Sequence, residues 1–553
     1  MQSITLKTVD DMEPRMRFSR SFKSSTQSLP SPDGAYIATI LPSKLSIRCT
    51  RSLDITRVVS LPAELAASVS WFLWSASSAR ILLASPDNIR VYSSLDSQFS
   101  ATLTNPTSGT TKATHVAFGA DDNEICVFSD FGIKMLIFNL VTSKSVEIHS
   151  PKFYHPGSAP KGLSYRPGTG NLALLTRCGG KDVISIHSRG ALDVTRSWWP
   201  ETVDAQGIQW SADGRWLVVW ESASQGHRLL VYTADGHLFK AWNGPMPMSE
   251  EDVDLTLGAG IKLFHWGCNG QHMAVGDYTD RVTILSAPSF SESMIITHTA
   301  DVKPTGSLQI WQEKITPSPN GFSREFVAAT QTVCPPTSAS SPPNSIEAKT
   351  GTNLLSLDHS GTLLATRTEN MPTTIWIWDI GSRILRAVMI LHVPIAKASW
   401  HPSIPEVLMI RCEGDEARGL VHVWEPSWTQ PRIIDFALHI PGGKLIGKTI
   451  CRWLNAGGAS AAMFFSDSQD FILACLPDSD DEEPPWEAGS RGNSVCDQQG
   501  ESPLLLVPAE NERGRVAIDS LIEDEGETFM SGGSEEVEDT FQFRKFVAPG
   551  LNG

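Results

Sequence analysis

The feature that most limits how this chain can fold is a phrase that recurs nine times along it. Each copy holds an alternating apolar run, a turn with Asp or Gly, and a second apolar run. The clearest copies are SPDG before AYIATI from Ser31, GIQWSADG before RWLVVW from Gly207, and LLSLDHSG before TLLATR from Leu354. The weaker copies start near Val69, His115, Gly162, Ile261, Ala398 and Ile450.

A third apolar run follows most of these pairs and usually ends in an aromatic residue, as in IRVYSS, MLIFNL and VHVWEP. The spacing of most copies is near the roughly 40 to 45 residues of a WD-repeat propeller blade. The run IWIWDI contains a literal Trp-Asp pair, Trp378 and Asp379, to which we assign a structural role; the Gly-His partner of the standard repeat is mostly missing. The sequence therefore predicts an all-β WD-repeat β-propeller with degenerate blades. A β-sandwich with fortuitous spacing, one wide ring of nine blades, and seven or eight blades with an extra sheet all stay open.

One blade cannot bury both of its faces, so the blades must stack and the last one must be completed to protect its edge. We therefore expect the segment after Met16, RFSRSFKSS, to supply a strand to the last blade near Ile450 to Leu476. This organisation gives a flexible N-terminus at 1–16 and a propeller at 17–476.

Two segments interrupt the pattern. An insertion at about 299–350 is rich in Pro, Ser and Thr and holds two strand-like runs, SLQIWQEKI and EFVAATQTV, so we expect a decorated loop between blades. The tail at 477–553 lacks apolar periodicity. From Asp478 it has 19 Asp and Glu against 5 Lys and Arg, a charge of −14 that predicts disorder.

The rest of the chain has 42 acidic and 40 basic residues, a charge of −2, with no basic block. This argues against nucleic-acid binding, which needs clustered Lys and Arg. Nine scattered Cys without a CxxC pair, and an N-terminus without an apolar signal core, favour an intracellular protein. The most apolar stretch, Ala66 to Ala84, is interrupted by five Ser and by Arg80, so no membrane insertion is expected.

Motifs for catalysis and for ligand binding are also missing. There is no GxxxxGK[ST] phosphate loop and no HExxH metal motif, and the segment GLSYR at 162–166 lacks the second Gly of a nucleophile elbow. The turn aspartates are interpreted as acceptors for backbone amides of their own turns: Asp33, Asp213, Asp358 and Asp379. The sequence predicts no enzyme activity, no cofactor and no metal.

Several runs together resemble the WD repeat-containing protein 8 family of centrosomal and spindle-pole proteins. They include SPDGAYIA at 31–38, GIQWSADGRWLVVWES at 207–222, HMAVGDYTDRVTIL at 272–285 and LLATRTENMPTTIWIWDI at 363–380. The likeness runs in order from about Phe18 to Leu476 and stops at the acidic tail.

The resemblance implies a non-catalytic scaffold of the cytoplasm and cytoskeleton, located at the spindle pole body or centrosome. Its implied partner is a coiled-coil anchoring protein, with links to a kinesin-14 minus-end motor and to the microtubule-nucleating complex. The implied role is to help anchor microtubule minus ends and organise the mitotic spindle.

Two other classes are weighed against this one. A propeller resembling a translation-initiation factor, acting in ribosome or RNA-associated assemblies, is expected to carry a basic extension, whereas this chain carries an acidic one. A propeller-capped serine peptidase requires a downstream α/β domain, and only the acidic tail follows the repeats.

The turn RTENMP is our candidate for binding a partner. Its Asn and Pro suit a chain reversal, and its Arg and its exposed-looking Met are residue types enriched at interfaces. The candidate residues are Arg367, Glu369, Asn370, Met371 and Pro372. We expect charge reversal at Arg367 combined with Met371→Ala to abolish partner capture without changing the melting curve; the alternative location is the insertion.

Overall fold

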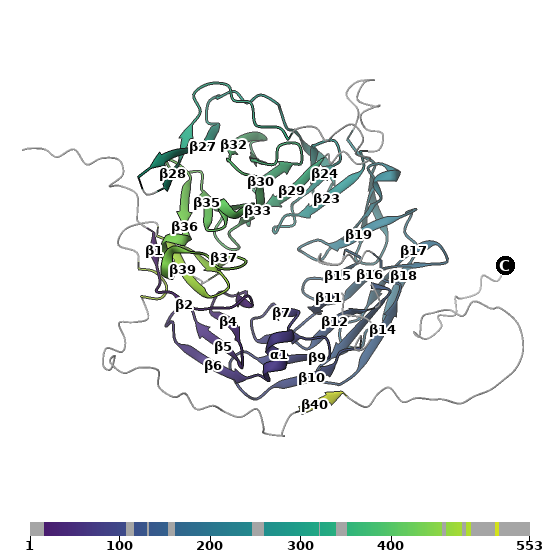
Figure 1. Ribbon diagram of the computed structural model, residues 1–553. Helices are drawn as coiled ribbons and strands as arrows, with labels where there is room; N and C mark the ends of the chain where they lie inside the picture. Colours follow the sequence, from purple (N-terminus) through teal and green to yellow (C-terminus); the bar gives the residue numbers. More distant parts are fainter. Residues whose placement is uncertain are drawn as a thin grey trace, which may run out of the picture. The chain divides into compact units, whose positions relative to one another are not determined.

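The computed structural model describes residues 16–106, 115–129, 132–152, 161–245, 259–319, 321–338, 351–455, 460–477, 483–487 and 515–518. Within these ranges the strands form nine separate sheets, one for each copy of the repeat (Figure 1). The fold is a nine-bladed β-propeller, as the all-β prediction required, and the β-sandwich alternative is wrong. The chain divides into two compact units, which are described separately.

The first unit comprises 1–67 and 244–509 and holds five blades, each built from strands that pair antiparallel in chain order. Their strands are β3 (Ser28–Pro30), β4 (Tyr36–Leu41), β5 (Lys44–Cys49) and β6 (Ile55–Ser60); β23 (Ile261–Trp266), β24 (His272–Asp277), β25 (Arg281–Ser286) and β26 (Ser291–Thr297); β29 (Thr352–Leu357), β30 (Leu363–Thr368), β31 (Thr374–Asp379) and β32 (Ile384–Ile390); β33 (Ile395–Trp400), β34 (Leu408–Cys412), β35 (Leu420–Trp424) and β36 (Arg432–Asp435); and β37 (Ile450–Leu454), β38 (Ala461–Ser466) and β39 (Asp470–Leu476). Short 3-10 turns are η4 (Asp415–Ala417), η5 (Phe436–His439) and η6 (Pro441–Gly443).

The second unit comprises 68–243 and 510–553 and holds four blades. Their strands are β7 (Trp71–Trp74), β8 (Arg80–Ala84), β9 (Asn88–Ser93) and β10 (Ser100–Thr104); β11 (His115–Phe118), β12 (Glu124–Ser129), β13 (Lys134–Asn139) and β14 (Ser145–His149); β15 (Leu163–Tyr165), β16 (Leu172–Cys178), β17 (Lys181–His187) and β18 (Val194–Trp198); and β19 (Ala205–Trp210), β20 (Trp216–Glu221), β21 (Leu229–Thr233) and β22 (Leu238–Trp242). A 3-10 turn, η3 (Ala223–Gln225), follows β20; α1 (Ala63–Ser68), of which all but Ser68 belongs to the first unit, precedes β7. No helix in the described ranges is long and apolar enough to cross a membrane.

The repeated turns form as their sequences predict. In SPDG, Asp33 accepts the backbone N–H of Ala35 at 3.0 Å, and Gly34 adopts a φ of 70°, which favours glycine. The other turn aspartates accept backbone amides in the same way: Asp213, Asp358 and Asp379. Their interpretation as turn-forming residues is confirmed.

The N-terminal segment completes the last blade, as predicted. Strands β1 (Arg17–Phe18) and β2 (Phe22–Lys23) pair antiparallel with β39, so they cover an edge that three strands alone would leave open. Phe22 is buried, and its ring stacks on Phe471 with 5.2 Å between centroids. Of the N-terminus predicted to be flexible, residues 1–15 lie outside the described ranges.

The described part of the tail extends the packed body beyond the predicted boundary at 476. Trp486 is only 6% exposed and joins the apolar cluster that includes Phe22 and Phe471. The acidic residues around Trp486 obscured this apolar anchor in the sequence. The packed body therefore extends beyond residue 476, where the propeller was predicted to end. Strand β40 (Arg515–Ile518) pairs parallel with β10. Besides β40, the described part of 477–553 consists of Pro477 and the segment 483–487, and all other residues of the tail lie outside the described ranges.

The insertion at 299–350 is built into a blade. Its two strand-like runs form β27 (Gln309–Ser318) and β28 (Gly321–Ala328), an antiparallel hairpin. Residues Gln309 to Gln312 pair parallel with β32. This pairing gives a six-stranded sheet in the order β28-β27-β32-β31-β30-β29. The expected decorated loop is therefore largely an extension of the seventh blade; residues 339–350 lie outside the described ranges.

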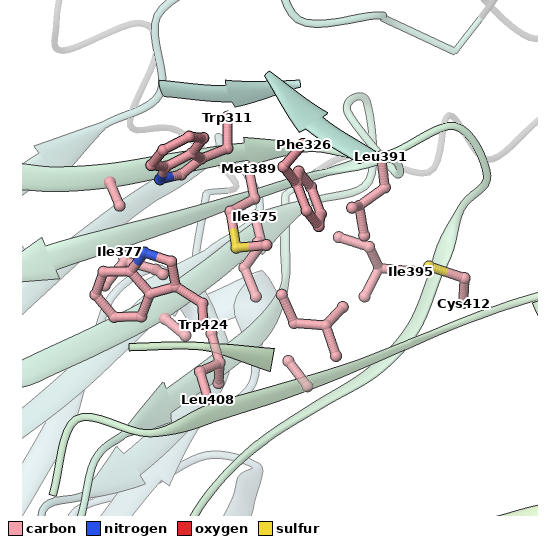
Figure 2. Packing of buried hydrophobic residues seen from close by; sticks show 14 of the residues in the cluster. Trp311, Phe326, Ile375, Ile377, Met389, Leu391, Ile395, Leu408, Cys412 and Trp424 are labelled. Carbon is pink, nitrogen blue, oxygen red and sulfur yellow. The ribbon is translucent and has the colours of Figure 1, made fainter. Parts of the chain in front are cut away.

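Apolar side chains from neighbouring blades form the core of the first unit. Figure 2 shows Ile375 and Met389 of the seventh blade packed with Leu408 and Trp424 of the eighth. The hairpin contributes the buried side chains Trp311 and Phe326 to the same cluster. The inserted hairpin is thus fixed by a shared core as well as by backbone pairing.

Candidate interaction surface

The predicted partner-binding turn connects β30 to β31, and its methionine is buried. Met371 is 4% exposed and packs in the cluster that contains Trp376 and Trp378. Our expectation of an exposed Met371 is wrong, because a short turn between two rigid strands can direct an apolar side chain back into the sheet interface. Truncating it creates a cavity, so the melting curve is not expected to stay unchanged.

The polar residues of this turn bind other parts of the first unit. Glu369 forms a salt bridge with Lys262 of β23 at 3.0 Å, and Asn370 donates from Nδ2 to Asp280 Oδ2 at 3.0 Å. Both contacts join the turn to the preceding blade, so these side chains already have structural partners.

The two ends of the turn are held in the same way. Arg367 donates from Nε to Asn353 Oδ1 at 2.8 Å, and burial lowers the pKa of its guanidinium. The carbonyl of Pro372 accepts the backbone N–H of Ile395, the first residue of the next blade, at 2.9 Å. The turn is therefore a junction between blades.

Trp378 of the Trp-Asp pair is buried and has a hydrogen-bond partner that the sequence did not indicate. Trp378 Nε1 donates to Thr366 Oγ1 at 2.9 Å, and Thr366 Oγ1 lies 2.8 Å from His298 Nε2. His298 precedes the insertion, so it is far from Trp378 in sequence. The only sequence signal is a Thr-His step after β26, where a standard repeat places Gly-His.

The protons in this chain of hydrogen bonds can be placed. His298 Nδ1 lies 2.8 Å from the carbonyl oxygen of Asp280, an acceptor, so Nδ1 carries the proton. Burial lowers the pKa of His298 to about 4, despite opposing effects of the Asp280 carbonyl and the Asp277 charge, so the neutral ring has a bare Nε2. Thr366 therefore accepts from Trp378 and donates to His298.

A buried charged centre fixes the inserted hairpin between the seventh and eighth blades. The carboxylate of Glu313 on β27 is fully buried and accepts from Arg324 Nη1 of β28 at 2.9 Å. It lies 3.3 Å from His422 Nε2 of β35 and accepts the backbone N–H of His392 at 2.8 Å. Burial alone raises the pKa of Glu313, but these donors outweigh it and bring the pKa to about 2.

Hydrogen bonds at the base of the hairpin add to this attachment. Gln309 accepts from Trp424 Nε1 at 3.0 Å and donates to the carbonyl of Pro426 at 3.0 Å. Since Gln309 begins β27, both the base and the middle of the hairpin are tied to the eighth blade. The hairpin is therefore a rigid element whose position depends on the propeller core.

The hairpin presents two apolar side chains to solvent. Phe322, near the far end, is 76% exposed, and Val327, opposite Gln312 near the base, is 43% exposed. Phe322 lies on the same strand face as the buried Phe326. Its partner in the hairpin is Pro317. Pro317 lies beyond Gln312, the last residue of β27 that pairs with β32. Within the described strands β28 pairs only with β27 and forms the edge of its sheet.

This arrangement suits the binding of another protein. No group of three or more His, Cys, Asp or Glu that could hold a metal occurs in the described residues. The edge strand β28 can accept an added strand, and Phe322 can anchor a partner's apolar side chains. The hairpin is therefore a second candidate interaction surface, beside the 367–372 turn, which stays a prediction.

Comparisons with known proteins agree with the repeat. No protein-family model matches the chain. It is 24% identical over 432 residues to the mouse (Mus musculus) WD repeat-containing protein WRAP73, covering 74% of this chain and 87% of that protein. It is 23% identical over 420 residues to an uncharacterized WD repeat-containing protein of Schizosaccharomyces pombe, covering 72% and 80%.

Solved structures with similarity to the chain include the Dos1 propeller, with a TM-score of 0.44, 11% identity and coverage of 74% of this chain and 93% of that one. A eukaryotic initiation factor gives a TM-score of 0.45 at 10% identity, covering 76% and 90%. The C-terminal WD40 domain of Sif2 gives 0.41 at 10% identity, covering 84% and 99%. The nine-sheet propeller and the two WD-repeat relatives support placing this chain in the WD-repeat family.

Proposed function

We propose that the protein is a non-catalytic scaffold at the spindle pole body or centrosome, which binds a coiled-coil anchoring protein and helps to anchor microtubule minus ends. The WD-repeat propeller supports the scaffold role, because propellers of this kind generally bind proteins without catalysis. The location and the partner class rest on the family resemblance of runs such as LLATRTENMPTTIWIWDI.

The observation that carries the scaffold proposal is the rigid hairpin β27–β28 with its exposed tip. The Glu313 centre and the Trp311 and Phe326 side chains fix the hairpin before any partner arrives, so binding costs little ordering entropy. Phe322 then provides an exposed aromatic anchor, a type that often dominates the energy of an interface. We assign the capture of the coiled-coil protein, and through it of a kinesin-14 motor and the microtubule-nucleating complex, to this tip.

The proposal is tested by affinity purification of the full chain, followed by mass spectrometry, with and without the double substitution Phe322→Asp and Val327→Asp. Loss of a buried aromatic anchor at an interface costs about 2 kcal/mol or more, a factor of about 30 in affinity. We expect the coiled-coil protein and spindle-pole components to be enriched with the native chain and lost with the variant.

Val141→Asp is the control, because Val141 is an exposed valine on a blade of the second unit, 64% exposed against 43% for Val327. This variant should capture the same proteins as the native chain. Enrichment of ribosomal proteins or initiation factors instead would contradict the spindle-pole function. Equal capture by the hairpin variant would leave the function standing and remove the hairpin as its site.

A further inference from the structure

A second exposed aromatic lies in the second unit, on the connection between β18 and β19, residues 199–204, here named the Trp199 loop. Trp199 is 72% exposed and Val203 is also exposed. The neighbouring Trp198 turns inward, with its ring 5.6 Å from that of Tyr232. Adjacent tryptophans thus have opposite orientations, and the outward one is available for binding.

Two buried carboxylates hold the Trp199 loop from beneath. Glu221 accepts the backbone amides of Val203 and Asp204, at 3.0 and 2.5 Å. Asp182 accepts the Thr202 hydroxyl at 2.9 Å. A loop held by its backbone presents its side chains with little loss of entropy on binding.

Basic side chains flank the same loop. Arg177 pairs with Asp204 at 3.1 Å, and Arg228 lies 3.6 Å from Glu201. Over residues 161–245, nine Lys and Arg side chains are at least partly exposed against five Asp and Glu, since the carboxylates of Asp182 and Glu221 are buried. The two blades that the Trp199 loop connects therefore carry an excess of exposed positive charge, which favours an acidic ligand with apolar side chains.

The chain itself contains a segment of this chemistry, joined to the same unit. Strand β40 pairs with β10, with Leu103 opposite Ile518, so the tail is attached to the second unit immediately before the segment begins. Residues 519–540 hold nine Asp and Glu and no Lys or Arg. Within 519–530, DSLIEDEGETFM, the acidic residues alternate with pairs of apolar ones.

We propose that the acidic segment 519–530 docks on the Trp199 loop of its own molecule. Its apolar residues cover the indole of Trp199, and its carboxylates face Arg177 and Arg228. Residue 519 follows β40 directly, so the segment is tethered to the second unit. Tethering raises the local concentration of the segment to about the millimolar range, so even a weak contact is occupied. The tail then acts as a built-in competitor for acidic partners at this surface.

The test places the photo-cross-linking residue p-benzoylphenylalanine at position 199 of the full chain. Trp199 is exposed, so this replacement should not affect folding. After irradiation, peptide mass spectrometry of the monomer should identify 519–530 as the cross-linked segment. The yield should fall at least about tenfold in a Glu523→Lys, Asp524→Lys, Glu525→Lys variant, and should also fall in about 0.5 M salt, which screens exposed charges.

The same cross-linker at Val141, exposed on another blade of this unit, is the control and should not capture 519–530. Four results would overturn the proposal: no cross-link from position 199, a cross-link to a second copy of the chain, capture of a different segment, or a yield that the lysine variant leaves unchanged. A cross-link from 199 to an added acidic protein in preference to 519–530 would also assign the surface to an external partner.

Discussion

Replacing Thr366 with valine should break the hydrogen-bond chain between Trp378 and His298 without changing the size of the side chain much. The substitution leaves one buried donor, Trp378 Nε1, and one buried acceptor, His298 Nε2, without the partner they have at 2.9 and 2.8 Å. A buried polar group without a partner costs about 1 to 3 kcal/mol, so for these two groups we expect the free energy of unfolding to fall by about 2 to 6 kcal/mol.

The assay is urea unfolding followed by tryptophan fluorescence, with two further variants. Thr366→Ser keeps the hydroxyl and loses only a methyl group, so it should cost about 1 kcal/mol. Thr102→Val changes an exposed threonine on β10 and should stay within about 0.5 kcal/mol of the native chain. If Thr366→Val proves as stable as Thr366→Ser, the hydroxyl does not link these two side chains and the assignment of the protons is wrong.

Three other predictions concern the same fold. Deleting residues 1–24 removes β1, β2 and the buried Phe22 and should lower the denaturation midpoint clearly, whereas deleting 1–15 should not; equal midpoints would refute completion of the last blade by the N-terminus. Folding lowers the pKa of His298 from its ordinary 6.5 to about 4, so the unfolded chain binds the proton more readily than the folded one. The free energy of unfolding should therefore fall by up to about 3 kcal/mol as the pH drops from 6.5 through 4. A His298→Gln variant should show a smaller loss across the same pH series. Met371→Ala alone should lower the free energy of unfolding by about 2 to 5 kcal/mol, measured by thermal or urea denaturation. An unchanged melt would refute the burial of Met371.

Sequence reasoning identified the blades because each blade is encoded locally. Alternation of apolar residues, a turn with Asp and Gly, and an aromatic third strand all lie within one repeat, so the nine copies marked nine sheets. The role of Asp33 was accessible for the same reason, since its partner Ala35 is two residues away. Completion of the last blade followed from a general requirement, that a sheet edge must be covered, together with a suitable segment after Met16.

The candidate surface required the tertiary structure, because its contacts join residues that no local pattern connects. Met371 was expected to be exposed from its place in a turn, and only the packing of the blade shows that it points inward. His298 contacts Thr366 across the whole insertion, and Glu313 contacts His422 of the next blade. Periodicity shows which face of a strand is apolar, but the packing of separate blades decides which neighbour this face contacts. The insertion that was expected to be a loop is a rigid hairpin because it packs against the neighbouring blade.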